Sequence, residues 1–250
     1  MAISVKNAEA IEYMRISCRI VAEVLEEMKH LVRPGVTTAE LDRIAEEIIR
    51  SYGAVPSFKG YEGYPASICA SVDDQVIHGI PSKKTVLREG SIVGIDVGAY
   101  LNGYHGDGAR TFAVGDIAPE AQKLMDVTRE SFFAGMKFAK AGNHLHEISA
   151  AVQAYAEKNG CGVVRDYVGH GVGREMHEDP PIPNYKTIGR GPKLVAGMTL
   201  AIEPMINLGR PEVEVLDDDW TVVTCDGSLS CHYENTILIT ETGYEILTQL

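Results

Sequence analysis

The sequence lacks most of the features that mark secreted, membrane-spanning and nucleic-acid-binding proteins. Its five cysteines are an odd number without CxxC spacing, which argues against a disulfide framework and against a zinc knuckle. No run of 18 apolar residues occurs and the first residues show no apolar leader, so we expect no membrane span and a cytoplasmic location. Lys and Arg total 23 against 35 Asp and Glu, which leaves no basic footprint for direct nucleic-acid binding.

Sequence motifs of several common catalytic mechanisms are also absent. The chain contains no G-x-S-x-G nucleophile elbow, no phosphate-binding G-x-x-x-x-G-K-[ST] loop and no G-x-G-x-x-G after a predicted strand. The motif H-E-x-x-H does not occur either, so a thermolysin-like zinc site is not indicated. With 250 residues, of which 45% are hydrophobic, the chain is long enough for one large domain or two small ones.

Helical and strand patterns both occur along the chain. Apolar residues at three- and four-residue steps predict helices, over about 8–31, 38–52, 119–140 and 144–159. Short apolar segments predict strands, over 91–97, 105–114, 163–168, 198–206, 220–225 and 229–240. Thr37, with Glu40 three residues later, is typical of a capping box, and Asn102-Gly103 is typical of a hairpin turn.

The second half of the sequence repeats features of the first half at an offset of 107 residues. Three glycines and one acid recur in this register, in the pairs Gly35 and Gly142, Gly53 and Gly160, Gly90 and Gly197, and Asp96 and Glu203. We interpret this as an internal duplication within a single catalytic domain, 1–250, with halves of approximately 1–115 and 116–250. Two related halves that face each other would place Asp96 and Glu203 in one site.

Carboxylates stand inside segments that otherwise have the pattern of buried strands. Asp96 lies in Ile-Val-Gly-Ile-Asp-Val, Glu203 lies in Leu-Ala-Ile-Glu-Pro-Met, and Glu234 precedes Asn-Thr-Ile-Leu-Ile. Burying an ionised carboxylate is costly unless it is paired or binds a metal. One such acid is explained by an ion pair, but three together indicate a bound cation. Asp107 is a fourth candidate ligand. A hairpin that turns beside Asn102 would place it nearly opposite Asp96, allowing for a bulge.

Three histidines have sequence surroundings that favour function. His170 lies in Gly-His-Gly-Val-Gly, whose glycines permit a ligand to approach closely, and His177 follows in Met-His-Glu-Asp-Pro. His78, in Val-Ile-His-Gly-Ile-Pro, is the third. A lone histidine is more often structural than functional. A functional site is favoured here because His170 and His177 share one glycine-rich segment. His105 and His232 lie close to the proposed ligands and are candidates to support them.

Four carboxylates and one imidazole form an oxygen-rich ligand set with nitrogen as the minor partner. Their combined negative charge is too large for one divalent ion and suits two ions that share bridging carboxylates. These ligand types favour Co, Mn, Fe or Zn over Mg or Ca alone, without choosing among the four.

The candidate ligands, taken together with their flanking residues, resemble those of a known family. The ordered set Asp96, Asp107, His170, Glu203 and Glu234 is similar to the five metal ligands of the methionine aminopeptidases, in their short bacterial type I form. The surrounding words match too, including His-Gly-Ile-Pro, Gly-Tyr-His-Gly-Asp, Ile-Glu-Pro-Met and Tyr-Glu-Asn-Thr, over essentially all 250 residues. The resemblance implies an α+β pita-bread (creatinase/aminopeptidase-like) fold, with two pseudo-symmetric α/β halves around a curved antiparallel sheet.

The resemblance also implies an activity and a metal arrangement. The activity is that of a metallo-exopeptidase that removes the initiator methionine from nascent proteins and peptides with a small second residue. Two divalent ions would be held per chain. Asp96 would bind one ion, His170 and Glu203 the other, and Asp107 and Glu234 would bridge them.

Catalytic and substrate-binding roles follow from the same resemblance. Glu203 would also handle the proton of the attacking water, His177 would stabilise the oxyanion, and His78 would contact the scissile nitrogen. The methionine side chain would lie among apolar, aromatic and sulfur-containing residues, with both histidines at its edge: Phe58, Tyr61, Tyr64, Cys69, His78, Met176, His177 and Trp220. Plain core packing is the alternative explanation for any one of the pocket residues.

Three residues depart from the family pattern. Met176 stands where many relatives have an aromatic residue or leucine, Asn235 stands where histidine is more frequent, and His232 stands where glutamine is common. These positions concern the shape of the pocket and the surroundings of the metal site. They leave the five ligands intact and leave the fine second-residue specificity open.

The implied partner is the N-terminal methionine of a nascent polypeptide, and the implied oligomeric state is a monomer. A transient ribosome contact is left open, although the region 210–219 is acidic and offers no basic docking patch. The same fold also permits two alternative functions. An Xaa-Pro aminopeptidase or dipeptidase usually carries an additional N-terminal domain, and a non-catalytic peptide-binding module has usually lost metal ligands.

Overall fold

The computed structural model describes residues 3–250. Its four α-helices are α1 (Ala8–Leu31), α2 (Thr38–Ser51), α3 (Pro119–Met136) and α4 (Leu145–Lys158). A short 3-10 helix, η1, covers Tyr61–Gly63. The four predicted helices are therefore confirmed, although α3 ends a few residues earlier than expected. The capping box of α2 is also confirmed, because Thr37 and Glu40 exchange side-chain and backbone hydrogen bonds.

Most strands are short, apart from the ten-residue β4 and β5, and all their pairings are antiparallel. In the first half they are β1 (Val55–Pro56), β2 (Ile68–Val72), β3 (Gln75–Ile77), β4 (Ile92–Leu101) and β5 (Tyr104–Ala113). In the second half they are β6 (Gly162–Val163), β7 (Gly169–Gly171), β8 (Glu178–Ile182), β9 (Thr199–Ile202), β10 (Met205–Asn207), β11 (Val213–Val215), β12 (Val222–Thr224), β13 (Ser230–His232), β14 (Asn235–Ile239) and β15 (Tyr244–Ile246). Strand β4 pairs with β1, β2 and β5, and a second large sheet has the order β15-β14-β9-β7-β8.

Two predicted strands of the second half are each divided by a break next to an acid. The segment predicted as 198–206 forms β9 and β10 on either side of Glu203 and Pro204, because proline has no N–H to give to a ladder. The segment predicted as 229–240 forms β13 and β14 on either side of Glu234. The strand predicted over 163–168 was too long, since β6 ends at Val163.

The hairpin of β4 and β5 differs in register from the expectation. Its ladder runs without a bulge, and Asp96 pairs with Ala109, two residues beyond Asp107. The cause is the two-residue turn at Asn102-Gly103, whose residues both have positive φ, 55° and 84°. The two acids consequently lie on the same face as diagonal neighbours, and the predicted bulge was wrong.

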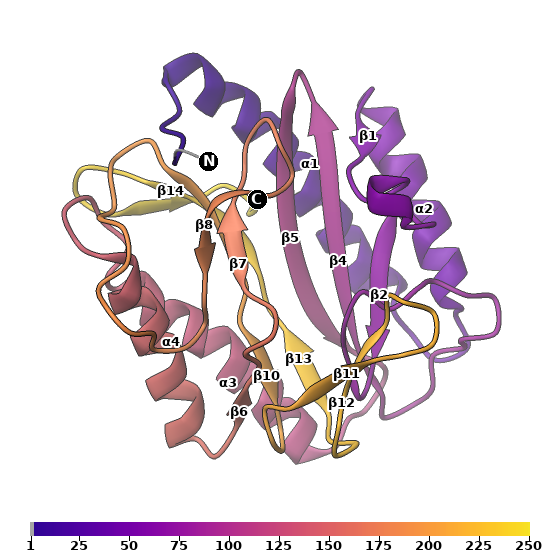
Figure 1. The fold of residues 1–250 in the computed structure, drawn as a ribbon. Coiled ribbons are helices and arrows are strands. Elements are labelled where there is room, and N and C mark those ends of the chain that lie inside the picture. The colour runs from indigo at the N-terminus through magenta and orange to yellow at the C-terminus, as the bar shows by residue number, and fades with distance from the viewer. Residues whose placement is uncertain (1–2) are drawn as a thin grey trace.

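Helices cover both halves of the molecule, as Figure 1 shows, with α1 and α2 beside the first-half strands and α3 and α4 at the lower left. Helix α1 packs against β4 and β5. The approach is close, because a Cβ on Gly106 of β5 would lie 2.6 Å from the backbone nitrogen of Cys18 on α1. Within the described residues, no helix has both the length and the apolar character needed to cross a membrane.

Local details recur between the two halves at the offset seen in the sequence. Gly35 and Gly142 have φ values of 90° and 96°. Their N–H groups donate to the carbonyl oxygens of Leu87 and Leu194, at 2.9 Å in both cases. These matching details support the internal duplication, which stays a proposal.

Candidate metal centre

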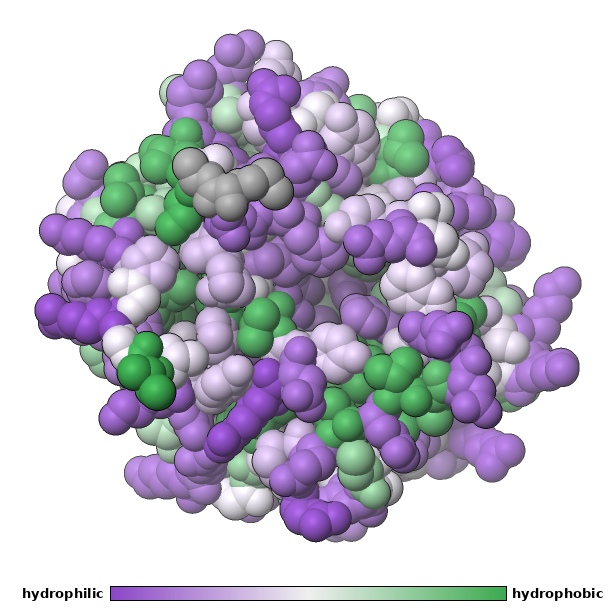
Figure 2. Space-filling view, in the orientation of Figure 1, coloured by the Kyte–Doolittle hydropathy of each residue, from purple (hydrophilic) through white to green (hydrophobic). Residues whose placement is uncertain are grey.

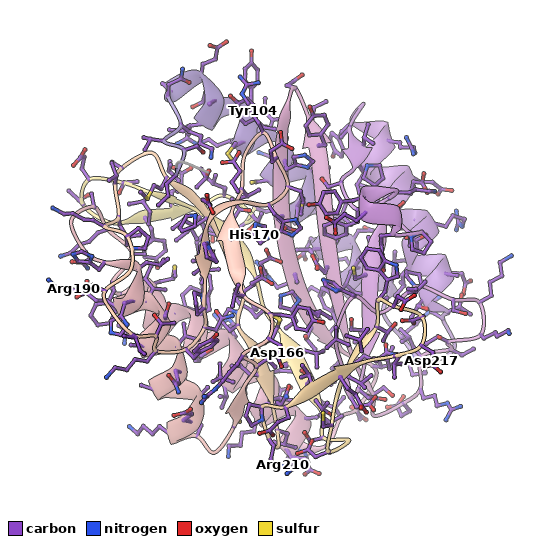
Figure 3. All side chains as sticks on the ribbon, in the orientation of Figure 1. Tyr104, Asp166, His170, Arg190, Arg210 and Asp217 are labelled. Atoms are coloured by element: carbon purple, nitrogen blue, oxygen red, sulfur yellow. The ribbon has the colours of Figure 1, made fainter. Side chains whose placement is uncertain are left out.

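The five predicted ligands come from five different segments and line one pocket of about 190 Å³. Asp96 lies on β4, Asp107 on β5 and His170 on β7, while Glu203 follows β9 and Glu234 precedes β14. Figure 3 shows His170 near the centre of this face, and Figure 2 shows that the face is hollowed there. The breaks beside Glu203 and Glu234 thus place both side chains at the junction of the two halves.

Hydrogen bonds across this junction hold the segments that carry the acids. The backbone N–H of Glu234 donates to the carbonyl oxygen of Ala109 at 2.9 Å. The hydroxyl of Thr236 donates to the carbonyl oxygen of Asp107 at 2.8 Å. Half-buried Arg110 donates to the carbonyl oxygen of Glu234 and, at 2.8 Å, to that of Ala109. Strand β5 and the start of β14 are therefore joined directly, which sets the distance between Asp107 and Glu234.

The potential ligand atoms converge without making short hydrogen bonds to each other. Nε2 of His170 lies 3.5 Å from Oδ2 of Asp107 and 3.6 Å from Oε1 of Glu203. Ligand atoms of Asp107, His170 and Glu234 lie within 4.8 Å of one another. Nδ1 of His170 lies 2.9 Å from the carbonyl oxygen of Gly171, to which it can donate. That bond leaves the Nε2 lone pair directed at the carboxylates, as a metal-binding imidazole requires.

The electrostatics of the buried acids call for an added positive charge. Burial raises the pKa of Asp96 and of Glu234 well above the usual range, and the nearby charge of Asp107 raises both further. Burial lowers the pKa of His170, but the nearby carboxylates of Asp107 and Glu203 outweigh it and raise the value to about 9. Protein groups alone therefore leave this site short of cations.

Unpartnered polar atoms provide a test of whether these residues fit metal ions. Oδ1 of Asp96, Oδ1 of Asp107 and Oε1 of Glu234 are buried and have no hydrogen-bond partner among the described residues. Leaving such atoms unsatisfied costs about 1–3 kcal/mol each. Carboxylate oxygens with imidazole nitrogen are the donors that divalent transition metals accept. The residues present fit a divalent metal centre.

The two other predicted histidines lie beside this centre. The ring centroid of His177 is 4.3 Å from that of His170, and its Nδ1 is 2.8 Å from the hydroxyl of Tyr61. The ring of His78 packs edge-on against Trp220. Burial, with a smaller contribution from neighbouring imidazoles, lowers the pKa of both His78 and His177 to about 4. Both rings are therefore neutral at pH 7.

The predicted substrate-binding residues all line the same pocket as the ligands: Phe58, Tyr61, Tyr64, Cys69, His78, Met176, His177 and Trp220. Tyr64, Cys69 and Met176 are buried, with 2–4% of each exposed. Tyr64 meets Trp220 edge-on at a centroid distance of 5.0 Å, and its hydroxyl donates to the carbonyl oxygens of Ile68 and Gly79. This end of the pocket is apolar and closed.

Four further residues line the pocket and were not predicted from the sequence: Glu62, Ile77, Tyr167 and Val168. Each stands next to or within three residues of a predicted site residue, so a search of the neighbours of those residues would have found them. Of the two histidines proposed as supports, His232 lies 3.5 Å from Glu203. His105 instead contacts Ser57 through Nδ1, at 2.9 Å.

Comparison with known proteins places this site in a family. The model of metallopeptidase family M24 matches residues 12–241. The chain belongs to metallopeptidase family M24. Among its relatives in that family, a methionine aminopeptidase of Clostridium acetobutylicum is 60% identical over 246 residues, which cover 98% of each chain. The crystal structure of a methionine aminopeptidase from Thermotoga maritima has a TM-score of 0.97 and 46% identity, covering 99% of this chain and 100% of that one.

More distant M24-like structures share the fold over only part of their length. Prolidase from Pyrococcus furiosus has a TM-score of 0.78 and 26% identity, covering 98% of this chain but 65% of that chain. The resemblance to methionine aminopeptidases and the α+β pita-bread fold, both predicted from the sequence, are thereby confirmed.

Proposed function

We propose that this chain is a methionine aminopeptidase, which removes the N-terminal methionine from peptides and proteins whose second residue is small. One observation carries the proposal. A single pocket holds five potential metal ligands at one end and a closed apolar subsite of aromatic and sulfur-containing side chains at the other. That subsite suits the unbranched thioether of methionine, because sulfur makes favourable contacts with aromatic rings.

The free amino group of the substrate accounts for the position of the carboxylates. A peptide whose methionine side chain lies against Tyr64 and Trp220 has its ammonium group close to the buried acids, which attract it electrostatically. An internal methionine has a neutral amide in place of that ammonium group, so the buried acids do not attract it. Cleavage is therefore confined to the first residue.

We further propose that two divalent ions occupy the site. Asp96 would hold one ion, His170 and Glu203 the other, and Asp107 and Glu234 would contribute an oxygen to each. When bound, such ions supply Lewis acidity, which polarises a carbonyl group and lowers the pKa of a water molecule. The unpartnered oxygens of Asp96, Asp107 and Glu234 support this arrangement.

The protein side chains then divide the remaining work. A carboxylate oxygen of Glu203 takes the proton of the attacking water and delivers it to the leaving amine. Neutral His177 donates from Nε2 to the developing oxyanion, and His78 donates to or accepts from the scissile amide nitrogen. The pocket walls exclude other water from the reacting carbonyl.

Methionine release from Met-Ala-Ser, beside an Ala-Pro-Ser control, tests this function. We expect chelator-treated protein to be inactive, and protein with added Mn or Co to cleave Met-Ala-Ser only. Glu203→Ala is expected to keep its circular-dichroism spectrum and lose this activity. Cleavage of the proline peptide alone would favour the prolidase-like alternative. Metal-loaded protein that cleaves neither peptide would favour the non-catalytic module.

The cellular setting is part of the same proposal. We propose that the substrate is the nascent polypeptide in the cytoplasm and that the protein acts as a monomer, with at most a transient ribosome contact. Sedimentation of the purified protein with and without ribosomes would report the oligomeric state and that contact together. A stable dimer would overturn the proposed state.

A further inference from the structure

His232 is a buried histidine at the metal centre that is not one of the five family ligands. Only 4% of the residue is exposed, and Nε2 has no hydrogen-bond partner among the described residues. This nitrogen lies 3.5 Å from Oε2 of Glu203 and 3.9 Å from Oε2 of Glu234. A buried ring nitrogen without a partner is costly, so its direction toward two carboxylates requires an explanation.

The distances do not suit direct hydrogen bonds to the carboxylates. Hydrogen bonds from a ring nitrogen to an oxygen are about 2.7–3.2 Å long, shorter than both separations. Two ligands that each lie about 2.1 Å from one metal ion, at right to tetrahedral angles, are about 3.0–3.4 Å apart. The 3.5 Å separation of His232 from Glu203 is close to that range, and the 3.9 Å separation from Glu234 is longer. The shorter separation also resembles those of His170, whose Nε2 lies 3.5 Å and 3.6 Å from its two carboxylates.

The three ligand atoms also form a compact group of their own. Atoms of Glu203, His232 and Glu234 lie within 4.8 Å of one another, as do those of Asp107, His170 and Glu234 in a second group. Glu203 faces one imidazole with each oxygen, since Oε1 is the nearer to His170 and Oε2 the nearer to His232. The two histidines therefore approach the carboxylate cluster from either side of Glu203.

The backbone of His232 is held on both of its polar groups. Its N–H donates to the hydroxyl of Thr111 at 3.1 Å, and its carbonyl oxygen accepts from the same hydroxyl at 2.9 Å. On the other side, His232 pairs with Met205 in the ladder of β13 and β10. The ring is thus directed into the centre by two neighbouring strands, β5 and β10, and not by a flexible loop.

We propose that Nε2 of His232 is a further nitrogen ligand of the metal centre, acting with Glu203 and Glu234. This inference rests on the proposed metal centre and adds a residue to it. A second imidazole makes the donor set richer in nitrogen, which favours Co, Fe or Zn over Mn or Mg. The chain would consequently retain the softer ions more tightly than a centre with one histidine.

Metal binding, measured without reference to activity, tests the proposal. Chelator-stripped wild type, His232→Gln and His232→Ala are titrated with Co²⁺ by calorimetry and by visible absorption. We expect both variants to lose about tenfold or more in Co²⁺ affinity at one site, as is typical when a residue that supports a metal is removed. Their visible Co²⁺ absorption bands should also differ from those of the wild type. Added imidazole is expected to restore the bands of His232→Ala. Unchanged affinity and bands in both variants would overturn the proposal.

A matched control and a measurement on the wild type remove the dependence on folding of the variants. His146→Gln is the control, because His146 also has a buried ring nitrogen without a partner among the described residues but belongs to neither group of clustered potential ligands. In the proton NMR spectrum of the Co²⁺-loaded wild type, two strongly shifted ring N–H signals are expected, and one signal would overturn the proposal. If wild type and His170→Ala both fail to bind Co²⁺, the metal centre itself is refuted. If His170→Ala loses Co²⁺ binding while both His232 variants bind as the wild type does, the role of His232 alone is refuted.

Discussion

The hydroxyl of Tyr61 lies 2.8 Å from Nδ1 of His177. A phenol that donates to Nδ1 leaves the proton of the neutral imidazole on Nε2, which is the tautomer needed to donate to a carbonyl oxygen. The pKa of His177, lowered to about 4 by burial and by His170, keeps the ring neutral at working pH. Tyr61 thus positions His177 and determines which ring nitrogen carries the proton.

Removing this hydroxyl tests the relationship. Tyr61→Phe keeps the ring but loses one hydrogen bond worth about 0.5–1.5 kcal/mol, so we expect kcat to fall about threefold to tenfold. KM for Met-Ala-Ser should change less, because the aromatic wall of the pocket remains. Tyr13→Phe is the control, since the hydroxyl of Tyr13 donates to Glu9 on the surface. Equal kcat values for Tyr61→Phe and wild type would contradict the tautomer argument.

A buried ion pair connects the N-terminal segment to the loop that carries Met176 and His177. Nζ of Lys6 lies 2.6 Å from Oε2 of Glu178, and Oε1 of Glu178 accepts from the backbone N–H of Arg174 at 2.8 Å. Lys6→Met leaves this carboxylate without its cation. We expect a loss of about 3 kcal/mol in the free energy of unfolding and a lower kcat/KM, measured by urea denaturation and by peptide cleavage.

An exposed pair provides the comparison for this prediction. Arg43 and Glu47 form an ion pair on the surface of α2, and surface pairs contribute about 0–1 kcal/mol. Arg43→Met should therefore leave both the free energy of unfolding and kcat/KM nearly unchanged. If Lys6→Met behaves in the same way, the N-terminal segment does not hold the loop.

The close contact of α1 with β5 depends on a glycine. A Cβ at Gly106 would lie 2.6 Å from the backbone nitrogen of Cys18, where no flexible side chain can move away. Gly106→Ala should lower the free energy of unfolding by about 1–3 kcal/mol, measured by chemical denaturation. Gly243→Ala is the control, because nothing lies within 4 Å of a Cβ there. Equal stability of the two variants would contradict the close packing.

Burial of His78 predicts a pH dependence of stability. Burial lowers the pKa of His78 from 6.5 to about 4, so between these values the unfolded chain binds a proton that the folded protein does not. The contribution of the neutral His78 ring to the free energy of unfolding is complete above pH 6.5. It is lost as the pH falls toward 4, by about 1–3 kcal/mol. Chelated wild type should therefore lose more free energy of unfolding over this range than His78→Gln. Parallel pH profiles would refute the prediction.

Much of the local structure and the chemistry of the site followed from the sequence. Helix periodicity and the capping box of Thr37 and Glu40 depend on neighbours a few residues away, so the four helices were predicted nearly to their ends. The acids in apolar segments and the glycine-flanked His170 indicated a metal centre because burying such groups is costly without a cation. These are properties of residue types and their immediate surroundings.

The tertiary structure decided how those residues meet. The register that makes Asp96 and Asp107 diagonal neighbours depends on the turn conformation at Asn102-Gly103, a matter of one residue that a pattern of period two does not resolve. The contact of Tyr61 with His177 and the approach of His232 to Glu203 join segments far apart in the chain. Only tertiary packing brings such segments together, because no local interaction relates them.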